Sequence, residues 1–237
     1  MQDASESNYV VRILEYQALD QLLQLQEAAM QGLTIQDTGK RFEPNVDSYV
    51  PLSKEEFQVI LEGKGLVIGC FADETLIAFH SLFYPGDHPD NLGYDFGMDA
   101  MQRLQVGHLE AACVHPLHRG HGIQTDLTRW LLRFTREQGN YRYLFETVAP
   151  TNLASVKSTL KSGLTLQRYQ LKYGGKKRFL FGIDLHKPFT YDVKQSSLIA
   201  VSDAMEVFEQ VFAQGYHGIE LVKQDDHAYV RFAKAFA

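Results

Sequence analysis

The sequence predicts an α/β (α+β) fold in which strands and amphipathic helices alternate, followed by a small C-terminal β-α-β-β extension. Two pairs of β-rich runs, at 65–84 and 164–185, are separated by short turns and indicate antiparallel hairpins. Around them, apolar residues recur at helical spacing, and several of these patterns end at glycine. With 237 residues, the chain is long enough for a large domain with an appendage and a sizeable core.

The first third of the chain is predicted to contain a strand, two helices and a hairpin. Ser53 and Glu56 have the spacing of a capping box, which marks the start of the second helix. Only Asp73 and Glu74 separate two β-rich runs, which is typical of a tight hairpin. The predicted order is a strand at 9–14, a helix ending at Gly32, an irregular stretch at 33–52, the second helix, and hairpin strands at 65–72 and 75–84.

A long polar loop and a strongly amphipathic helix follow. The loop at 85–105 carries one arginine and four aspartates, and loops of this length tend to be functional or mobile. A strand is predicted at 106–114, and apolar residues at helical spacing then predict a helix at 120–138. The aspartates of the loop are Asp87, Asp90, Asp95 and Asp99.

The next segment repeats the alternation of strand and helix. A strand at 141–148 leads into a helix that begins at Asn152 and ends at Gly163, because glycine favours the left-handed conformation that ends helices. The second hairpin follows, with strands at 164–173 and 176–185.

The remaining residues predict the extension, with a strand at 198–201, a helix at 202–214 and strands at 218–223 and 228–233. We therefore divide the chain into domains at 1–186 and 187–237. At roughly 50 residues, the extension is near the size where a lone core is marginal. It is expected to pack on the main domain or on a second subunit, as a homodimer.

Composition excludes several classes of protein. The formal net charge of −6 argues against nucleic-acid binding, which usually requires a basic surface. Cys70 and Cys113 lie inside apolar runs, where buried reduced thiols are expected. The sequence contains no apolar stretch approaching the ~20 residues of a membrane span, and no signal-peptide core. We expect a cytoplasmic protein without a membrane or nucleic-acid partner.

The most informative segment is V-H-P-L-H-R-G-H-G-I at 114–123, where a strand passes through a glycine turn into the strong helix. Gly120 and Gly122 allow a ligand to approach the backbone closely, and the N–H groups and dipole of a helix N-terminus suit a pyrophosphate. A plain connecting turn beside a solvated arginine face is the alternative. The nucleotide patterns G-x-x-x-x-G-K-[ST] and G-x-G-x-x-G do not fit, the second because Thr125 stands where its last glycine belongs.

R-G-H-G-I after a V-H-P strand end resembles the coenzyme A-binding motif R/Q-x-x-G-x-G/A of the GNAT superfamily of acyl-coenzyme A-dependent N-acyltransferases. Arg119 and Gly122 match this motif, whereas Gln124 stands where the family prefers glycine or alanine. The order of elements over 9–186 is also similar to that of the family. The resemblance implies a GNAT-like mixed, mostly antiparallel twisted sheet flanked by helices, with acetyl-CoA as cosubstrate and no metal.

The resemblance also implies a set of binding residues. The fourth and fifth strands of the family separate to admit the pantetheine arm, which here would lie beside 112–114. A second family motif, an Asn with a Gly eleven residues later, is similar to Asn152 and Gly163. The implied coenzyme-binding residues are Ala112, Cys113, Val114, Arg119, Gly120, His121, Gly122, Ile123, Gln124, Thr125, Asn152 and Ser155.

Acyl transfer to an amine needs a base, because an alkylamine with a pKa of about 10.4 is mostly protonated at neutral pH. Glu110 is the candidate catalytic base, since it lies on the strand that enters the glycine turn. Glu146 on the next strand is the reserve, and an ordinary surface carboxylate is the alternative interpretation of Glu110. By resemblance, the backbone N–H of Val114 would stabilise the oxyanion.

The proton donor for the leaving thiolate is less clearly marked. The family often has a tyrosine seven residues after the Asn of its second motif, and this chain has Thr159 there. Tyr169, Tyr173 or water could replace it, although tyrosines in hairpins more often serve cross-strand packing.

Two further groups of residues invite a functional interpretation. His115, His118 and His121 recur every third residue, but a zinc site is rejected because these histidines lie in the turn whose amides must stay open. The aspartates of 85–105 could attract a cationic acceptor, such as a polyamine, an aminoglycoside or a lysine side chain, or could simply be solvated.

The sequence therefore predicts an N-acetyltransferase that acts by direct attack of a primary amine, on a small-molecule or protein acceptor. The alternative is a non-catalytic acyl-CoA sensor, which the departures at Gln124 and Thr159 keep open. A third interpretation, compatible with the first, makes the extension a module that binds a protein substrate.

Overall fold

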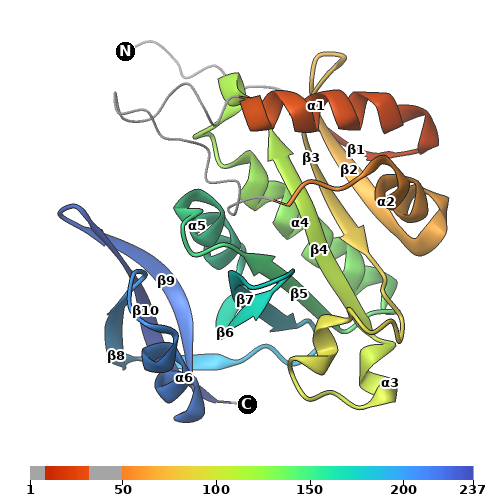
Figure 1. Cartoon of the computed structure of the whole chain (residues 1–237). Helices are drawn as coiled ribbons and strands as arrows, with labels where there is room; N and C mark the ends of the chain where they lie inside the picture. The colour runs from red at the N-terminus through yellow and green to blue at the C-terminus, as the bar shows by residue number, and fades with distance from the viewer. Residues whose placement is uncertain (1–8, 32–49, 237) are drawn as a thin grey trace. The chain divides into compact units, whose positions relative to one another are not determined.

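The computed structural model describes residues 9–31 and 50–236 (Figure 1). The predicted helix stop at Gly32 therefore lies outside the described residues. So does most of the predicted irregular stretch at 33–52. The chain forms two compact units, each with its own strands and helices. Of the described residues, unit 1 holds 9–31, 51–83 and 110–127, and unit 2 holds residue 50, 84–109 and 128–236.

Unit 1 is built on the first hairpin. The antiparallel strands are ordered β1-β2-β3, with Tyr9 opposite Ala72 at one end of the β1–β2 ladder. The second half of β4 lies beside β3 in the sheet. Here Ser81 Oγ donates to the Ala111 carbonyl at 3.2 Å, and the His115 N–H donates to the Ile77 carbonyl at 2.8 Å. The strands are β1 (Tyr9–Leu14), β2 (Gly65–Ala72), β3 (Thr75–Phe83) and β4 (Val106–Val114).

The helices of unit 1 bury one apolar face each. The predicted capping box is confirmed, since Ser53 Oγ accepts from the Glu56 N–H and the Glu56 carboxylate accepts from the Ser53 N–H. Phe57 of α2 lies edge-to-face on Phe79 of β3, with ring centroids 5.6 Å apart. The helical segments are a 3-10 turn (Tyr16–Ala18), α1 (Leu19–Gln31), α2 (Lys54–Val59), a π turn (Ile60–Lys64) and a 3-10 turn (Pro116–His118).

Unit 2 contains a mixed, mostly antiparallel sheet. The first half of β4 pairs in parallel with β5, and the antiparallel strands follow in the order β5-β7-β6-β9-β10-β8. The parallel ladder runs from Val106–Tyr143 to Leu109–Glu146. The remaining strands are β5 (Tyr143–Val148), β6 (Thr165–Lys172), β7 (Lys176–Asp184), β8 (Thr190–Ala200), β9 (Tyr216–Gln224) and β10 (His227–Phe236).

Helices α5 and α6 pack on strands β6 and β9 in this sheet. Phe208 of α6 lies fully buried between Tyr169 and Phe179, with ring centroids 5.1 and 5.2 Å away, and also meets Phe232 of β10. The C-terminal β-α-β-β order is thus confirmed, and α6 packs on the β6–β7 hairpin. The helices are a 3-10 turn (Leu92–Tyr94), α3 (Ala100–Arg103), α4 (Ile123–Gln138), which begins in unit 1, α5 (Leu153–Ser162) and α6 (Met205–Ala213).

Three predicted elements differ from the structure. The strong helix begins at Ile123, not at residue 120, because Gly120 and Gly122 have φ values of 84° and 80°. The loop at 85–105 contains the short helix α3, which Asp99 caps. Strand β8 is much longer than the predicted 198–201. The domain boundary after residue 186 stays a prediction.

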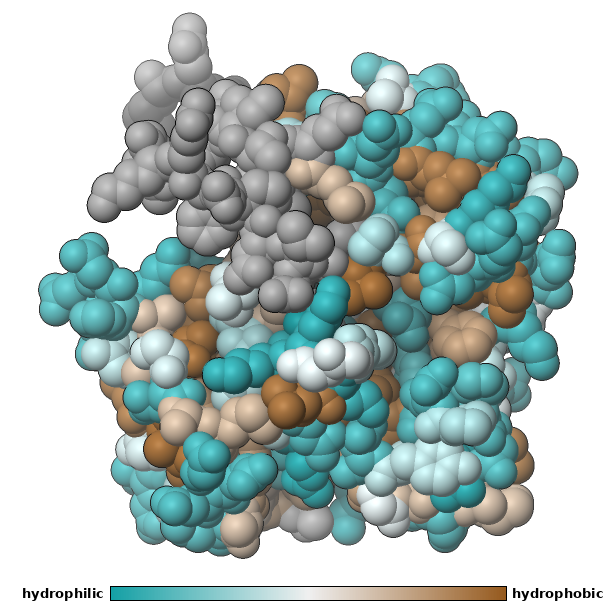
Figure 2. Space-filling view, viewed as in Figure 1, coloured by the Kyte–Doolittle hydropathy of each residue, from teal (hydrophilic) through white to brown (hydrophobic). Residues whose placement is uncertain are grey.

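The surface agrees with the composition. Hydrophilic residues cover much of the face shown in Figure 2, and hydrophobic residues lie between them in small groups. Over the described parts of the chain, no helix is long and apolar enough to cross a membrane.

Candidate active site

The turn between β4 and α4 is exposed at its glycines. Gly120, His121 and Gly122 are all exposed, and both glycines adopt positive φ. Apart from the residues that flank each glycine, no heavy atom of the described chain lies within 4 Å of a Cβ placed on it. The glycines are therefore required by backbone conformation, and the space beside them is open to a ligand.

Gly122 occupies the N-cap position of α4, because its carbonyl accepts from the Asp126 N–H at 3.1 Å. Ser53 and Asp99 cap α2 and α3 with their side chains, whereas a glycine has no side chain with which to cap. The N-terminus of a 16-residue helix is thus presented behind an open glycine turn. This arrangement suits an anion.

Arg119 fixes the turn from within unit 1. Its Nη2 donates to the Ala29 carbonyl of α1 at 2.6 Å, and its Nε to the Val114 carbonyl at 3.3 Å. Burial lowers the pKa of this guanidinium, against an opposing effect of Cys113. The side chain thus binds two backbone carbonyls, and a contribution of Arg119 to coenzyme binding stays a prediction.

The other predicted coenzyme residues of unit 1 differ in exposure. Ala112 and Val114 are half-buried, whereas Cys113 between them is buried, as the alternation of a strand requires. At the start of α4, Gln124 is half-buried, and both Ile123 and Thr125 are buried. A ligand beside β4 would therefore meet Ala112 and Val114 first.

In unit 2, Asn152 begins α5 as predicted. Its side-chain oxygen accepts from the Ser155 N–H at 3.2 Å, and Gly163 ends the helix with a φ of 106°. Two arginines of α4 also bind backbone carbonyls: Arg129 that of Lys161 at 2.8 Å, and Arg136 that of Leu185 at 3.2 Å.

The two candidate carboxylates have different surroundings. Glu110 is half-buried, between the buried side chains of Leu109 and Ala111. Glu146 is only 5% exposed and accepts from Thr159 Oγ1 at 2.9 Å. Thr159, at the position of the family tyrosine, is itself 1% exposed. The accessible carboxylate is thus Glu110, and the Thr159 hydroxyl is turned toward Glu146.

The two candidate tyrosines are also distinguished. Tyr169 is buried edge-to-face against Phe179, with centroids 4.8 Å apart, and burial raises its pKa. Tyr173 is 49% exposed, and its hydroxyl lies 3.1 Å from Thr147 Oγ1 of β5. Packing therefore accounts for Tyr169 but not for Tyr173.

The three histidines of the turn contact one another through ring edges and a backbone carbonyl. The rings of His115 and His118 meet edge-on at 5.9 Å, and His121 Nδ1 lies 3.3 Å from the His118 carbonyl. Within 9–31 and 50–236, no group of three or more His, Cys, Asp or Glu residues could hold a metal ion.

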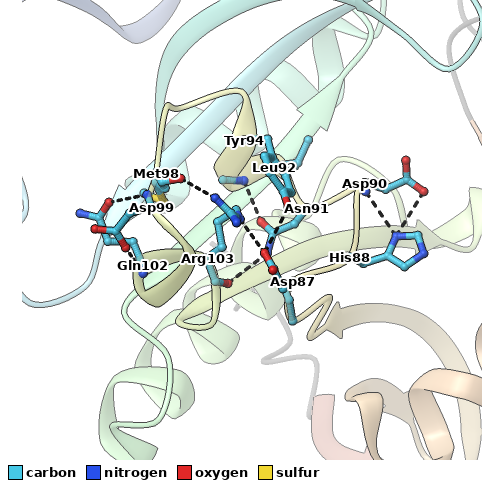
Figure 3. Close-up of polar contacts among 12 residues, drawn as sticks. Asp87, His88, Asp90, Asn91, Leu92, Tyr94, Met98, Asp99, Gln102 and Arg103 are labelled. Carbon is cyan, nitrogen blue, oxygen red and sulfur yellow. Dashed lines mark hydrogen bonds and ion pairs between the residues drawn. The ribbon is translucent and has the colours of Figure 1, made fainter.

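The aspartates of 85–105 mostly hold the loop in place (Figure 3). Asp87 accepts from Arg103 Nε at 2.7 Å, a hydrogen bond that lowers the pKa of this carboxyl. Asp99 caps α3, and Asp95 pairs with Lys172 of β6 at 2.7 Å. Asp90, whose side chain is 92% exposed, pairs with His88 at 3.5 Å.

Residues that the sequence analysis missed complete this loop. His108 of β4 is buried, and its Nε2 accepts from the Leu92 N–H at 3.0 Å. Phe96 stacks on Phe145 of β5, with centroids 4.1 Å apart, and Asn91 donates to the Arg103 carbonyl at 3.0 Å. The spacing of Asp99 and Gln102 was a detectable signal for the cap, whereas the other contacts have no local signature.

Comparison with known proteins assigns the chain to a class. The sequence profile of the Acetyltransferase (GNAT) family matches residues 25–163, which is more than half of the chain. The chain belongs to this family, and the resemblance found in the sequence is confirmed. A search of curated proteins gave no match.

Solved structures share the fold. An N-acetyltransferase from Staphylococcus aureus Mu50 is 17% identical with a TM-score of 0.54, over 76% of this chain and 99% of that one. Ribosomal-protein-S5-alanine acetyltransferase from Vibrio fischeri is 13% identical with a TM-score of 0.55, over 78% and 98%. Aminoglycoside acetyltransferase AAC(6')-Ib, in complex with coenzyme A and kanamycin, is 12% identical with a TM-score of 0.53, over 75% and 95%.

Proposed function

We propose that this chain is an N-acetyltransferase that transfers the acetyl group of acetyl-CoA to a primary amine. The observation that carries the proposal is the exposed glycine turn, which presents the N-terminus of α4 with glycine at the N-cap. A helix N-terminus of this kind suits the coenzyme pyrophosphate. Family membership and a neighbour solved with coenzyme A support the same ligand.

In the proposed reaction, the pyrophosphate binds at Gly120–Ile123 and the pantetheine arm follows Ala112–Val114. The acceptor amine attacks the thioester carbonyl directly, and the Val114 N–H stabilises the developing oxyanion. Collapse of the tetrahedral intermediate breaks the C–S bond and releases coenzyme A. Asn152 and Ser155, which form the N-terminal cap of α5 in unit 2, are proposed as coenzyme-binding residues from the family resemblance alone.

Glu110 is the proposed general base. Only roughly one alkylamine molecule in a few thousand is neutral at pH 7, so a nearby base has much to contribute. Glu110 is half-buried and thus more accessible than Glu146, which is buried against Thr159. Glu110→Gln should depress turnover most at low pH and leave coenzyme binding intact. Turnover that is unchanged across the pH range would remove Glu110 from the mechanism.

The acceptor is best sought with an amine panel. Since Asp87, Asp95 and Asp99 bind within the chain, they give little support to a cationic acceptor. The panel should cover small-molecule acceptors with a polyamine and an aminoglycoside. It should cover protein acceptors with a lysine peptide and a peptide that has a free N-terminus. Cys70 and Cys113 are both buried and neither forms a disulfide within the described part of the chain, which supports a reducing cytoplasm as the location.

The competing proposal is a catalytically idle acyl-CoA sensor. The burial of Thr159 against Glu146 favours it, because no side chain at this position offers a proton to a thiolate. Thiol release from acetyl-CoA across the amine panel, with a parallel coenzyme A titration, separates the two. Binding without turnover supports the sensor, and absence of binding contradicts both proposals.

A further inference from the structure

Arg119 stands immediately before the glycine turn and is half-buried in unit 1. Its Nη2 donates to the Ala29 carbonyl at 2.6 Å, and its Nε donates to the Val114 carbonyl at 3.3 Å. These two nitrogens form an edge of the guanidinium that can hold a carboxylate or a phosphate with two parallel hydrogen bonds. Because two backbone carbonyls occupy this edge, it does not grip the coenzyme pyrophosphate.

The Ala29 carbonyl lies in the last turn of α1. The last four carbonyls of a helix have no partner within the helix, so Arg119 supplies a donor from outside α1. Arg119 also places a positive charge at the negative end of the helix dipole, where the last turn of α1 has no basic residue. The contact therefore stabilises the end of α1.

The Val114 carbonyl lies at the base of the glycine turn. It belongs to the peptide group between Val114 and His115, whose N–H donates to the Ile77 carbonyl of β3 at 2.8 Å. Both polar groups of this peptide are thus bound, one by Arg119 and one by the neighbouring strand. Figure 1 shows α1 beside the end of β4 from which the turn starts. One side chain therefore joins α1, the end of β4 and the turn, all within unit 1.

The turn itself needs such support. Glycine has more backbone freedom than other residues, so an ordered glycine turn costs more conformational entropy. Gly120, His121 and Gly122 are all exposed, and their own side chains pack against nothing that fixes the two glycines. A contact that orders the base of the turn before the ligand arrives reduces the entropy cost of binding.

We propose that Arg119 is a positioning residue, which holds the glycine turn in its binding conformation by tying it to the end of α1. The pyrophosphate is left to the backbone N–H groups of the turn. The inference rests on the proposed function, in which coenzyme A binds at this turn. Because such coupling is reciprocal, coenzyme A that orders the turn also stabilises the last turn of α1.

The first test compares two substitutions in the full-length chain, with coenzyme A as the ligand. Arg119→Gln removes the charge and the guanidinium edge. Arg119→Lys keeps a positive charge, which binds phosphate as a point charge, but it cannot form the two parallel hydrogen bonds. The Kd for coenzyme A should rise by about 10-fold in both variants, and Arg119→Lys should lose as much affinity as Arg119→Gln.

Salt distinguishes a positioning residue from a phosphate ligand. Added salt screens the attraction between a cation and a bound phosphate, so the contribution of a phosphate ligand shrinks as salt rises. For a residue that acts on backbone carbonyls, the ratio of the Kd of Arg119→Gln to that of the wild type should be the same at about 0.05 M and about 0.5 M NaCl.

Hydrogen exchange of backbone amides tests the connection to α1. In the wild type, coenzyme A should slow the exchange of residues 28–31, which form the last turn of α1, as well as that of the glycine turn. In Arg119→Gln without ligand, the amides of 28–31 should exchange faster than in the wild type. Saturating coenzyme A should no longer slow them.

Arg129→Gln is the matched control. Arg129 Nη2 donates to the Lys161 carbonyl in the last turn of α5 at 2.8 Å. The substitution therefore removes the same charge and the same kind of contact with a helix end. The Kd for coenzyme A and the exchange of residues 28–31 should both stay at the wild-type values.

Several results would overturn the assignment. Wild-type affinity in Arg119→Lys, or a Kd ratio that falls toward one as salt rises, would show that Arg119 binds the pyrophosphate. Exchange of residues 28–31 that coenzyme A does not slow in the wild type would contradict the coupling, even if both variants fail to fold. A wild type that does not bind coenzyme A contradicts the proposed function, whereas exchange without ligand still decides whether Arg119 holds α1.

Discussion

A single methyl group at Gly122 should disrupt the turn into α4. The φ of Gly122 is 80°, and the surrounding space is empty out to 4 Å from an added Cβ among the described atoms. Gly122→Ala therefore introduces no clash, and its cost is the left-handed conformation alone, roughly 1–2 kcal/mol. The free energy of unfolding, measured by urea denaturation, should fall by this amount.

The effect of Gly122→Ala on coenzyme A affinity should be larger than this strain suggests. If the turn relaxes, at least one amide loses its charge-assisted hydrogen bond to the pyrophosphate, which is worth about 1.5–3 kcal/mol. The Kd from calorimetric titration should then rise by about 10- to 100-fold.

Gly139→Ala is the matched control for this experiment. Gly139 follows the last residue of α4 with a φ of 71°, and the nearby described atoms leave equal space for a Cβ. The free energy of unfolding of Gly139→Ala should fall about as much as that of Gly122→Ala, whereas the affinity of Gly139→Ala for coenzyme A should stay at the wild-type value. Equal affinities of the two variants would refute the role of the glycine turn in binding.

Two further predictions concern buried polar groups. Thr159→Val keeps the side-chain shape but removes the hydrogen bond to Glu146 at 2.9 Å, so the free energy of unfolding should fall by about 1–3 kcal/mol in urea denaturation; no change would show that this bond contributes nothing. Burial, assisted by Arg168, lowers the pKa of His217 from 6.5 to about 4. Because the unfolded state binds the proton more tightly, stability should decrease as pH falls from 6.5 toward 4, by up to about 1.4 kcal/mol per pH unit. His80, whose pKa burial lowers to about 3, adds a similar slope. His217→Gln should therefore flatten the pH dependence of the urea midpoint only in part, and an unchanged curve would contradict the burial of a neutral His217.

The sequence predicted those elements whose signals are local. The capping box at Ser53 depends on residues three positions apart, and Gly120 and Gly122 are required by their own positive φ values. Strand β8 was predicted too short because Thr190–Ser197 is largely polar, and its place in the sheet comes from pairing with distant β10. Its first pairs also shift register at Ala233, which no local pattern reveals.

The sequence predicted the backbone turn of the candidate site, but not the contacts that its side chains make with residues far away in the chain. Asp95 pairs with Lys172, 77 residues away, and Arg119 binds the Ala29 carbonyl, 90 residues away. Such pairings depend on tertiary structure, and composition alone could only suggest solvated charges. Likewise, the departure at Thr159 was visible in the sequence, whereas its hydrogen bond to Glu146 was not.

The central claim is tested most directly by incubating the chain with isotopically labelled acetyl-CoA and the amine panel, and then measuring acceptor mass and free thiol together. The proposed function predicts that at least one amine gains one labelled acetyl group for each thiol released, and that Glu110→Gln lowers both in proportion. Coenzyme A binding without any acetylated amine would contradict the enzyme and support the sensor.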